Sequence, residues 1–260
     1  LNRALENVGN FPILTGAAPS ARPAAFGKTL LIPSRGSVMI VVKDDGTYDE
    51  VQFPDDGEIL SAPSLSGDTA AVYEKSFAGS IYLMKNQKII NASEPMEIDG
   101  IGFDSPALLE SGGFLYTAFI TQSGRFYLFK DAKLEEGFPI ETNGVFYTNV
   151  VSCGTFFFAL SEDAEVYRFA LDGTFTTVKI PGASSARQGK IASVRTASGD
   201  AVYACADENV LYGFMQSLEL VPGFPVAGRG VPVIADVNGD KKGECIVLSF
   251  DKNLYAWDIQ

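Results

Sequence analysis

The chain has 260 residues and a formal net charge of −12 at neutral pH, and 46% of its residues are hydrophobic, including 19 Phe and 10 Tyr. This apolar content is enough for a large folded core. No stretch of the sequence approaches the roughly 20 consecutive apolar residues that a membrane-spanning helix needs. The acidic balance, without any run of Lys or Arg, argues against a nucleic-acid partner.

Two residue types restrict the chemistry. Histidine is absent, which removes the commonest general base, the Ser/His and Cys/His nucleophile pairs and the main imidazole metal ligand. The three cysteines, Cys153, Cys205 and Cys245, are irregularly spaced and contain no C-x-x-C pair, which argues against a disulfide framework or a zinc site. We therefore expect buried thiols and little catalytic chemistry.

A short phrase recurs along the chain. "VGNFPILTG" at residues 8–16 returns as "EGFPIETNG" at 136–144 and "PGFPVAGRG" at 222–230. The two later copies close a longer unit, whereas the first copy stands before any unit. The first copy therefore stands at the start of the chain, ahead of the unit that such a phrase would normally close.

The longer unit contains an alternating apolar and aromatic run that occurs six times. The centres of these runs are spaced by 43, 45, 40, 45 and 43 residues, at Met39, Tyr82, Tyr127, Tyr167, Tyr212 and Tyr255. A polar turn precedes each run, and another apolar run, often beginning with proline as in "SPALL" and "VPVIA", lies upstream of that turn. Alternation after a polar turn is typical of a hairpin, and proline suits the first residue of a strand.

Each unit is thus interpreted as strands A, B and C, followed by strand D in a "GFP(I/V)" or "EPMEI" segment. Four short strands in about 40 to 45 residues have the size of a propeller blade. The sixth unit ends after strand C at Gln260, and residues 8–14 supply one D strand too early. We predict an all-β, six-bladed β-propeller with four antiparallel strands per blade, a single domain over residues 1–260, in which residues 8–14 form the outer strand of the blade built by residues 230–260. Two small β-sandwiches are the alternative, but they predict neither the spacing nor the displaced strand.

One loop carries metal-binding chemistry. "DVNGDKKGE" joins strands A and B of the sixth unit, where other units have tight turns. It places Asp236, Asn238 and Asp240 at positions 1, 3 and 5, the backbone carbonyl of Lys242 at position 7 and Glu244 at position 9. Hard oxygens at alternate positions of a turning loop are what Ca²⁺ prefers, so we predict a structural calcium site. The alternative is an acidic surface turn whose Asp and Asn side chains bond their own backbone.

The sixth unit also resembles a known family. "GFPVAGRGVPVIADVNGDKKGECIVLSFDKNLYAWD" is similar to the repeats of FG-GAP/VCBS propellers, which are related to the integrin α-subunit propeller. The resemblance implies calcium in the loop between strands A and B, on the face opposite the usual partner-binding side. The other five units keep the strand signatures without the acidic loop, and Lys241 stands where the family prefers glycine.

The opposite face is formed by the D-to-A connections and the B-to-C turns. The residues that we consider there as candidates for binding a ligand or partner are Arg22, Arg187, Arg229, Phe103 and Tyr147. Charges on solvated loops and aromatic packing between blades are the alternative explanations. The C-strand tyrosines and "FFF" at 156–158 recur with the blades, so we expect them to be structural.

These observations favour a noncatalytic binding module that presents its loop face to a protein or glycan. We expect an extracytoplasmic location (periplasmic, surface-anchored or secreted, in a bacterial envelope or secreted protein), because a calcium loop fills where calcium is abundant. No leader opens the chain, which starts inside a repeat as a processed or trimmed part of a larger protein would. The alternative function is a polysaccharide hydrolase or lyase with paired carboxylates at the channel mouth, drawn from Glu162, Asp163, Asp207, Glu208 and Asp251.

Overall fold

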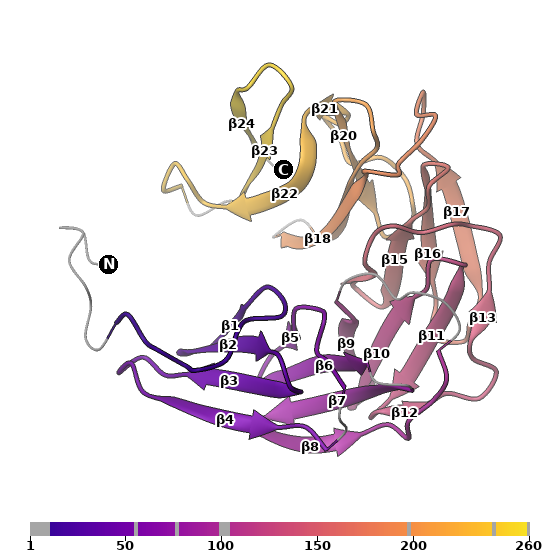
Figure 1. Ribbon diagram of the computed structural model, residues 1–260. Helices are drawn as coiled ribbons and strands as arrows, with labels where there is room; N and C mark the ends of the chain where they lie inside the picture. The colour runs from indigo at the N-terminus through magenta and orange to yellow at the C-terminus, as the bar shows by residue number, and fades with distance from the viewer. Residues whose placement is uncertain are drawn as a thin grey trace. The chain divides into compact units, whose positions relative to one another are not determined.

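The computed structural model describes residues 11–54, 57–75, 78–98, 105–196, 199–240 and 243–258. Within these ranges the regular structure consists of β-strands (Figure 1). No helix in them has the length and hydropathy required to cross a membrane.

The strands form six antiparallel sheets in chain order. The first sheet contains β1 (Ala24–Phe26), β2 (Thr29–Ser34), β3 (Val38–Val42) and β4 (Tyr48–Gln52). The second contains β5 (Ser64–Ser66), β6 (Thr69–Lys75), β7 (Gly79–Lys85) and β8 (Lys88–Ala92). The third contains β9 (Ala107–Ser111), β10 (Phe114–Ile120), β11 (Arg125–Lys130), β12 (Lys133–Leu134) and β13 (Ile140–Glu141), the last two both paired with β11.

The remaining three sheets continue this pattern. The fourth contains β14 (Val151–Cys153), β15 (Phe156–Leu160), β16 (Glu165–Phe169) and β17 (Phe175–Lys179). The fifth contains β18 (Lys190–Thr196), β19 (Gly199–Cys205), β20 (Val210–Met215) and β21 (Val226–Ala227). The sixth contains β22 (Arg229–Ala235), β23 (Glu244–Leu248) and β24 (Leu254–Asp258). The chain is a six-bladed β-propeller, as predicted, and each of the six run centres lies in the third strand of its sheet.

The hairpin turns explain why the strands reverse where they do. Two-residue turns between antiparallel strands favour positive φ at both residues, because that backbone twist matches the twist of the strands. Asn86 and Gln87 have φ values of 49° and 65° between β7 and β8. Asp131 and Ala132, with φ values of 46° and 64°, reverse the chain between β11 and β12 in the same way.

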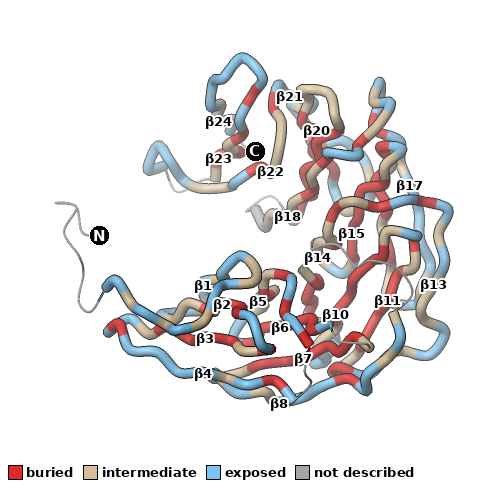
Figure 2. The backbone as a smooth tube through the Cα atoms, in the orientation of Figure 1, coloured by how far each residue is buried: buried red, intermediate tan, exposed pale blue. Residues whose placement is uncertain are grey.

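In the first five sheets the second and third strands are largely buried on both faces, whereas the outer strands are more exposed (Figure 2). The buried side chains of β15, such as Phe157 and Phe158 at 0% exposure, alternate between two covered faces. The outer strands β4 and β17 are exposed at four of their five positions. A run of apolar residues is therefore typical of the middle strands, and polar residues are tolerated at the edge.

The prediction for strand D was wrong in three blades. The outer strands β4, β8 and β17 have the sequences "YDEVQ", "KIINA" and "FTTVK", not a "GFP" or "EPMEI" segment. The predicted segments do supply β13 and β21, and Met96 of "EPMEI" makes an isolated bridge to Gly79. Because the edge strand packs on one side only, its sequence carries a weak apolar signal and does not resemble the other strands of the repeat.

The predicted closing strand remains a prediction. Residues 8–10 lie outside the described residues, and Phe11 to Leu14 belong to no strand of the described part. The sixth sheet has three strands within that part of the chain.

The described residues fall into two compact units, and the prediction of a single domain remains a prediction. The first unit comprises the described residues within Leu1–Ile98, Asp104–Thr117 and Phe129–Leu134, and the second comprises those within Ala118–Leu128 and Glu135–Gln260.

Each unit has its own core between neighbouring sheets. In the first unit, Leu31 and Met39 of the first sheet pack with Val72 and Tyr82 of the second. In the second unit, Phe158 and Val166 of the fourth sheet pack with Val202 and Phe214 of the fifth. The C-strand residues Tyr82, Tyr127, Tyr167 and Tyr212 are all buried. The predicted structural role of the recurring aromatic residues is confirmed at these positions.

Candidate metal centre and loop face

The acidic loop connects β22 to β23 in the second unit. Ala235 and Glu244 are partners in the ladder between these strands, so the ends of the loop are held at adjacent backbone positions. Asp236 directly follows β22, and Glu244 is the first residue of β23. The loop side chains therefore start from a fixed base.

This base brings three of the five predicted ligands together. One carboxylate oxygen from each of Asp236, Asp240 and Glu244 lies within 4.8 Å of the other two. Two oxygens that bind one Ca²⁺ at about 2.3–2.6 Å are separated by at most about 5 Å, so the spacing suits a shared ion. Lys242 lies outside the described residues.

Hydrogen bonds within the loop orient these oxygens. Glu244 is 3% exposed, and its carboxylate accepts the Val237 N–H at 2.8 Å and the Asn238 Nδ2–H at 3.2 Å. Asp236 Oδ1 accepts the Gly239 N–H at 2.6 Å, and Asn238 Oδ1 accepts the Asp240 N–H at 2.9 Å. The left-handed backbone that this turn needs falls on Gly239, with φ of 83°.

The donor set fits a divalent cation. Three carboxylates this close repel one another when ionised, and one of them, Glu244, is buried. A hard cation relieves the repulsion and accepts oxygen ligands from several directions. The side-chain-to-backbone bonds of Asp236 and Asn238 are also those of an acidic turn without metal.

The opposite ends of the strands carry the second candidate region, which we call the loop face. Here the B-to-C turns bond to the D-to-A connections within the second unit. Glu162 donates its N–H to Val145 O at 2.6 Å, and Asp207 donates its N–H to Ser185 O at 3.0 Å. These bonds place both kinds of connection on one side of the sheets, as predicted for a propeller.

Two of the three predicted arginines on the loop face lie against aromatic rings. The guanidinium carbon of Arg187 is 5.3 Å from the ring centroid of Tyr147. The guanidinium carbon of Arg229 is 4.3 Å from the centroid of Phe250, and its Nη2 donates to Gln188 Oε1 at 2.6 Å. Cation–π contact holds a guanidinium in place and leaves its edge available for hydrogen bonds.

The remaining two predicted residues are Arg22 and Phe103. Arg22 is exposed and belongs to the first unit, and Phe103 lies outside the described residues. Sequence reasoning missed Phe250 and Gln188. Phe250 belongs to the polar turn "SFDK", and only its position before Asp251 in a B-to-C turn could have placed it on this face.

The acidic residues of the loop face mainly hold the loops. Asp207 accepts the Ser185 hydroxyl at 2.8 Å and the Gln188 N–H at 2.8 Å. The Ser184 N–H, together with other hydrogen bonds, lowers the pKa of Glu208 below its ordinary value. The Tyr255 hydroxyl, 2.6 Å from Asp251, and the Asn253 N–H lower the pKa of Asp251 to about 2. A general acid needs the opposite shift, so neither Glu208 nor Asp251 is tuned to protonate a leaving group.

The three thiols are buried and none forms a disulfide, as expected. Burial raises the pKa of Cys205 to about 11 and that of Cys245 to about 12. A thiol with such a pKa carries little thiolate at neutral pH, so burial does not activate either cysteine as a nucleophile.

Comparison with known proteins gives the fold and no family. No protein-family model matches the sequence, and no curated protein matches it. Among solved structures, BBS1N, crystallised in complex with ARL6DN, is similar with a TM-score of 0.70 at 10% identity, over 94% of this chain and 78% of that one.

Two further structures are similar. Virginiamycin B lyase from Staphylococcus aureus has a TM-score of 0.61 at 15% identity, over 94% of this chain and 85% of that one. BamB from Moraxella catarrhalis has a TM-score of 0.52 at 10% identity, over 95% and 85%. At such identities the likeness supports the propeller fold alone.

Proposed function

We propose that the chain is a noncatalytic, extracytoplasmic binding propeller of the FG-GAP/VCBS type, which presents its loop face to a protein partner. In this proposal a structural Ca²⁺ is held by Asp236, Asn238, Asp240 and Glu244, with the backbone carbonyl of Lys242. The ion and the partner occupy opposite ends of the strands.

The observation that carries the proposal is the pair of arginine–aromatic contacts on the loop face. Arg187 over Tyr147 and Arg229 over Phe250 are preorganised, because each guanidinium already lies against a ring. Arginine and tyrosine are enriched among the residues that dominate protein interfaces. The similar BBS1N structure is a complex with another protein, which favours a protein over a glycan as the partner.

A noncatalytic role agrees with the chemistry of the site. The lowered pKa values of Glu208 and Asp251 disfavour a glycosidase-type acid. The similar lyase is described as catalytically inactive when one histidine is replaced by alanine, and this chain contains no histidine. The proposal therefore excludes that lyase's chemistry and retains only its architecture.

Calcium would contribute stability rather than chemistry. When bound, the ion would neutralise the three clustered carboxylates and tie β22 to β23 at the end of the sheet. Asp236 would be oriented by the Gly239 N–H that its carboxylate accepts, and Asp240 by the bond from its own N–H to Asn238 Oδ1. Glu244 would anchor the ion to β23. An ion held mainly by exposed side chains fills where calcium is abundant, which supports the extracytoplasmic assignment.

Site-specific photo-crosslinking in the native host tests the partner. A photoreactive residue replaces the exposed Val145 on the loop face, and in a matched control it replaces Asp172, in the turn at the other end of β16. We expect a discrete protein adduct from position 145 and none from position 172, with the adduct lost in the Arg187→Glu, Arg229→Glu double variant. Adducts of equal yield from both positions, or an adduct that the double variant retains, would refute the loop face as the binding surface.

A further inference from the structure

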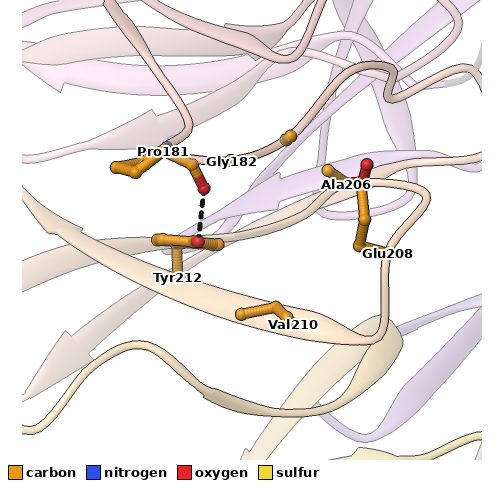
Figure 3. A pocket seen from close by; sticks show the side chains of 7 residues that line it. Pro181, Gly182, Ala206, Glu208, Val210 and Tyr212 are labelled. Carbon is orange, nitrogen blue, oxygen red and sulfur yellow. Dashed lines mark hydrogen bonds between the residues drawn. The ribbon is translucent and has the colours of Figure 1, made fainter.

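A pocket of about 200 Å³ opens on the fifth blade, in the second unit. Its walls come from the connection that follows β17 and from the facing ends of β19 and β20. Figure 3 shows Pro181 and Tyr212 at one end of the pocket and Ala206 and Glu208 at the other. The lining also includes Ala183 and Val210, so the walls are largely apolar and Glu208 is the one acidic residue among them.

The polar atoms at the two ends of the pocket differ in the hydrogen-bonding capacity that they leave for a ligand. The Tyr212 hydroxyl donates to Pro181 O at 2.6 Å, so its proton is used (Figure 3). At the other end, Glu208 Oε1 accepts both the N–H and the hydroxyl of Ser184, each at 3.1 Å. Glu208 Oε2 is covered and meets no donor within the described part of the chain. One acceptor oxygen of this carboxylate is therefore unused.

Within the described residues, the carboxylate has no cationic partner. No described Lys or Arg side chain forms an ion pair with Glu208, and its lowered pKa keeps it ionised at neutral pH. A covered anionic oxygen without a donor costs free energy that a ligand can recover by supplying a positive group. The chain's net charge of −12 attracts a basic partner over a longer range.

Pocket size and acceptor count select the kind of cation. Drug-sized ligands occupy pockets of about 300–1,000 Å³, so a volume near 200 Å³ suits a single side chain. A guanidinium prefers two free carboxylate oxygens, and Ser184 already occupies one of them. An ammonium needs one oxygen, and Oε2 is the oxygen that Ser184 leaves without a donor in the described part of the chain. The aliphatic stem of lysine matches walls of proline, alanine and valine.

We propose that the Glu208 pocket receives a lysine side chain of the protein partner, with the stem along Pro181 and Val210 and the ammonium at the Glu208 carboxylate. The source of the lysine rests on the proposed function, because Ser184 belongs to the same connection as Arg187 and bonds to Glu208 in the neighbouring B-to-C turn. The pocket adds a cation-accepting position to a surface otherwise marked by arginines.

The chemistry of the pocket is tested with Nα-acetyl-lysine methylamide, followed by amide NMR shifts of the ¹⁵N-labelled protein. We expect saturable shifts around Ala183 and Val210 at millimolar concentration. The norleucine analogue has a similar stem without the ammonium, and the arginine analogue has a cation of the wrong geometry. Each should bind at least tenfold more weakly. Equal binding of the norleucine analogue, or no saturable shift with the lysine analogue, overturns the proposal.

Two variants test whether the lysine analogue binds in this pocket. Glu208→Gln keeps an acceptor for Ser184 and removes the charge, and Val210→Phe fills the stem channel while leaving the charge in place. Both should weaken binding of the lysine analogue at least tenfold, whereas Asp172→Asn, in an exposed turn of the fourth blade, should leave binding unchanged. Unaltered binding in both pocket variants refutes the assignment.

The crosslinking experiment separates this proposal from the proposed function. Binding of the lysine analogue without any loop-face adduct supports the pocket and removes the partner proposal. A loop-face adduct whose yield Glu208→Gln does not lower keeps the partner proposal and removes the pocket from its interface. Loss of the adduct in Glu208→Gln, with the lysine analogue bound by the wild type, supports both.

Discussion

The fourth and sixth blades are built from the same repeat and are covered differently. In the fourth blade, Phe157 and Phe158 are both at 0% exposure although they point to opposite faces of β15. In the sixth blade, Val233, Leu248 and Leu254 are 57%, 56% and 70% exposed. The sixth blade packs one face, through Cys245 and Val247, on the fifth blade.

The fourth blade has a neighbour on each side within its unit. Phe126 of β11 stacks on Phe169 with ring centroids 4.1 Å apart, and the other face of the sheet packs on the fifth blade. Apolar packing on both faces therefore stabilises the fourth blade. The sixth blade has three strands in the described part of the chain and packs on one face, so other interactions must contribute more to its stability. The predicted closing strand and the predicted calcium loop both belong to the blade that packing covers least.

Truncating a phenylalanine should expose this contrast most strongly. Phe158→Ala leaves a cavity in a sealed core and should cost about 3–5 kcal/mol of unfolding free energy. Phe250→Ala, at a position 56% exposed in the sixth blade, should cost about 1 kcal/mol or less. Urea unfolding followed by far-UV circular dichroism measures both. Similar costs would show that the sixth blade is packed as tightly as the fourth.

The closing strand should have the next largest effect. Deleting residues 1–14 should lower protection against amide exchange in β24 by about 3 kcal/mol, comparable to burying one leucine side chain, because the predicted strand pairs with β24 and covers its apolar residues.

The amides of β16 in the fourth blade serve as the internal control and should keep their protection. If β24 exchanges at the same rate with and without residues 1–14, the ring is not closed by this segment.

The blade repeat could be predicted from sequence because it depends on strands buried on both faces. Tyr127 and Tyr167 recur because a bulky residue must fill the space between blades, and this requirement leaves a periodic apolar signal. The outer strands β4, β8 and β17 could not be predicted, since a polar edge strand such as "FTTVK" resembles a loop.

The candidate sites divide in the same way. The acidic loop was visible because its ligands are neighbours in sequence, from Asp236 to Glu244. The Arg229–Phe250 contact and the Glu208 pocket join residues about 20 or more positions apart, and only the pairing of strands brings them together. Sequence alone found Arg187, Tyr147 and Arg229 and missed Phe250 and Gln188, which hold Arg229.

Calcium should stabilise the sixth blade by a smaller amount. At a free concentration about 30 times the dissociation constant, an ion bound only by the folded state adds about 2 kcal/mol, which raises the melting temperature of a chain this size by about 4–8 °C. Thermal melts with calcium and with chelator measure the shift.

Asp240→Asn removes one carboxylate of the cluster and should abolish most of this shift. Asp172→Asn changes a similar acidic turn of the fourth blade, where the carboxylate accepts the Thr174 N–H, and should leave the shift intact. Equal melting temperatures of the wild type in calcium and in chelator would leave the empty acidic turn as the correct interpretation.

The smallest effect concerns Asp251, which is fully exposed in the last turn of the sixth blade. Its pKa is lowered to about 2, first by the Tyr255 hydroxyl and then by the Asn253 N–H. A depressed folded-state pKa adds stability above the unfolded-state pKa near 3.9, and this stability is lost as pH falls through about 2.

Tyr255→Phe should raise the titration midpoint of the Asp251 carboxyl carbon in NMR, and Asp251→Asn should flatten the pH dependence of the free energy of unfolding between about pH 4 and 2. A midpoint that Tyr255→Phe leaves unchanged would mean that the Asn253 N–H, and not the tyrosine hydroxyl, holds this carboxylate ionised.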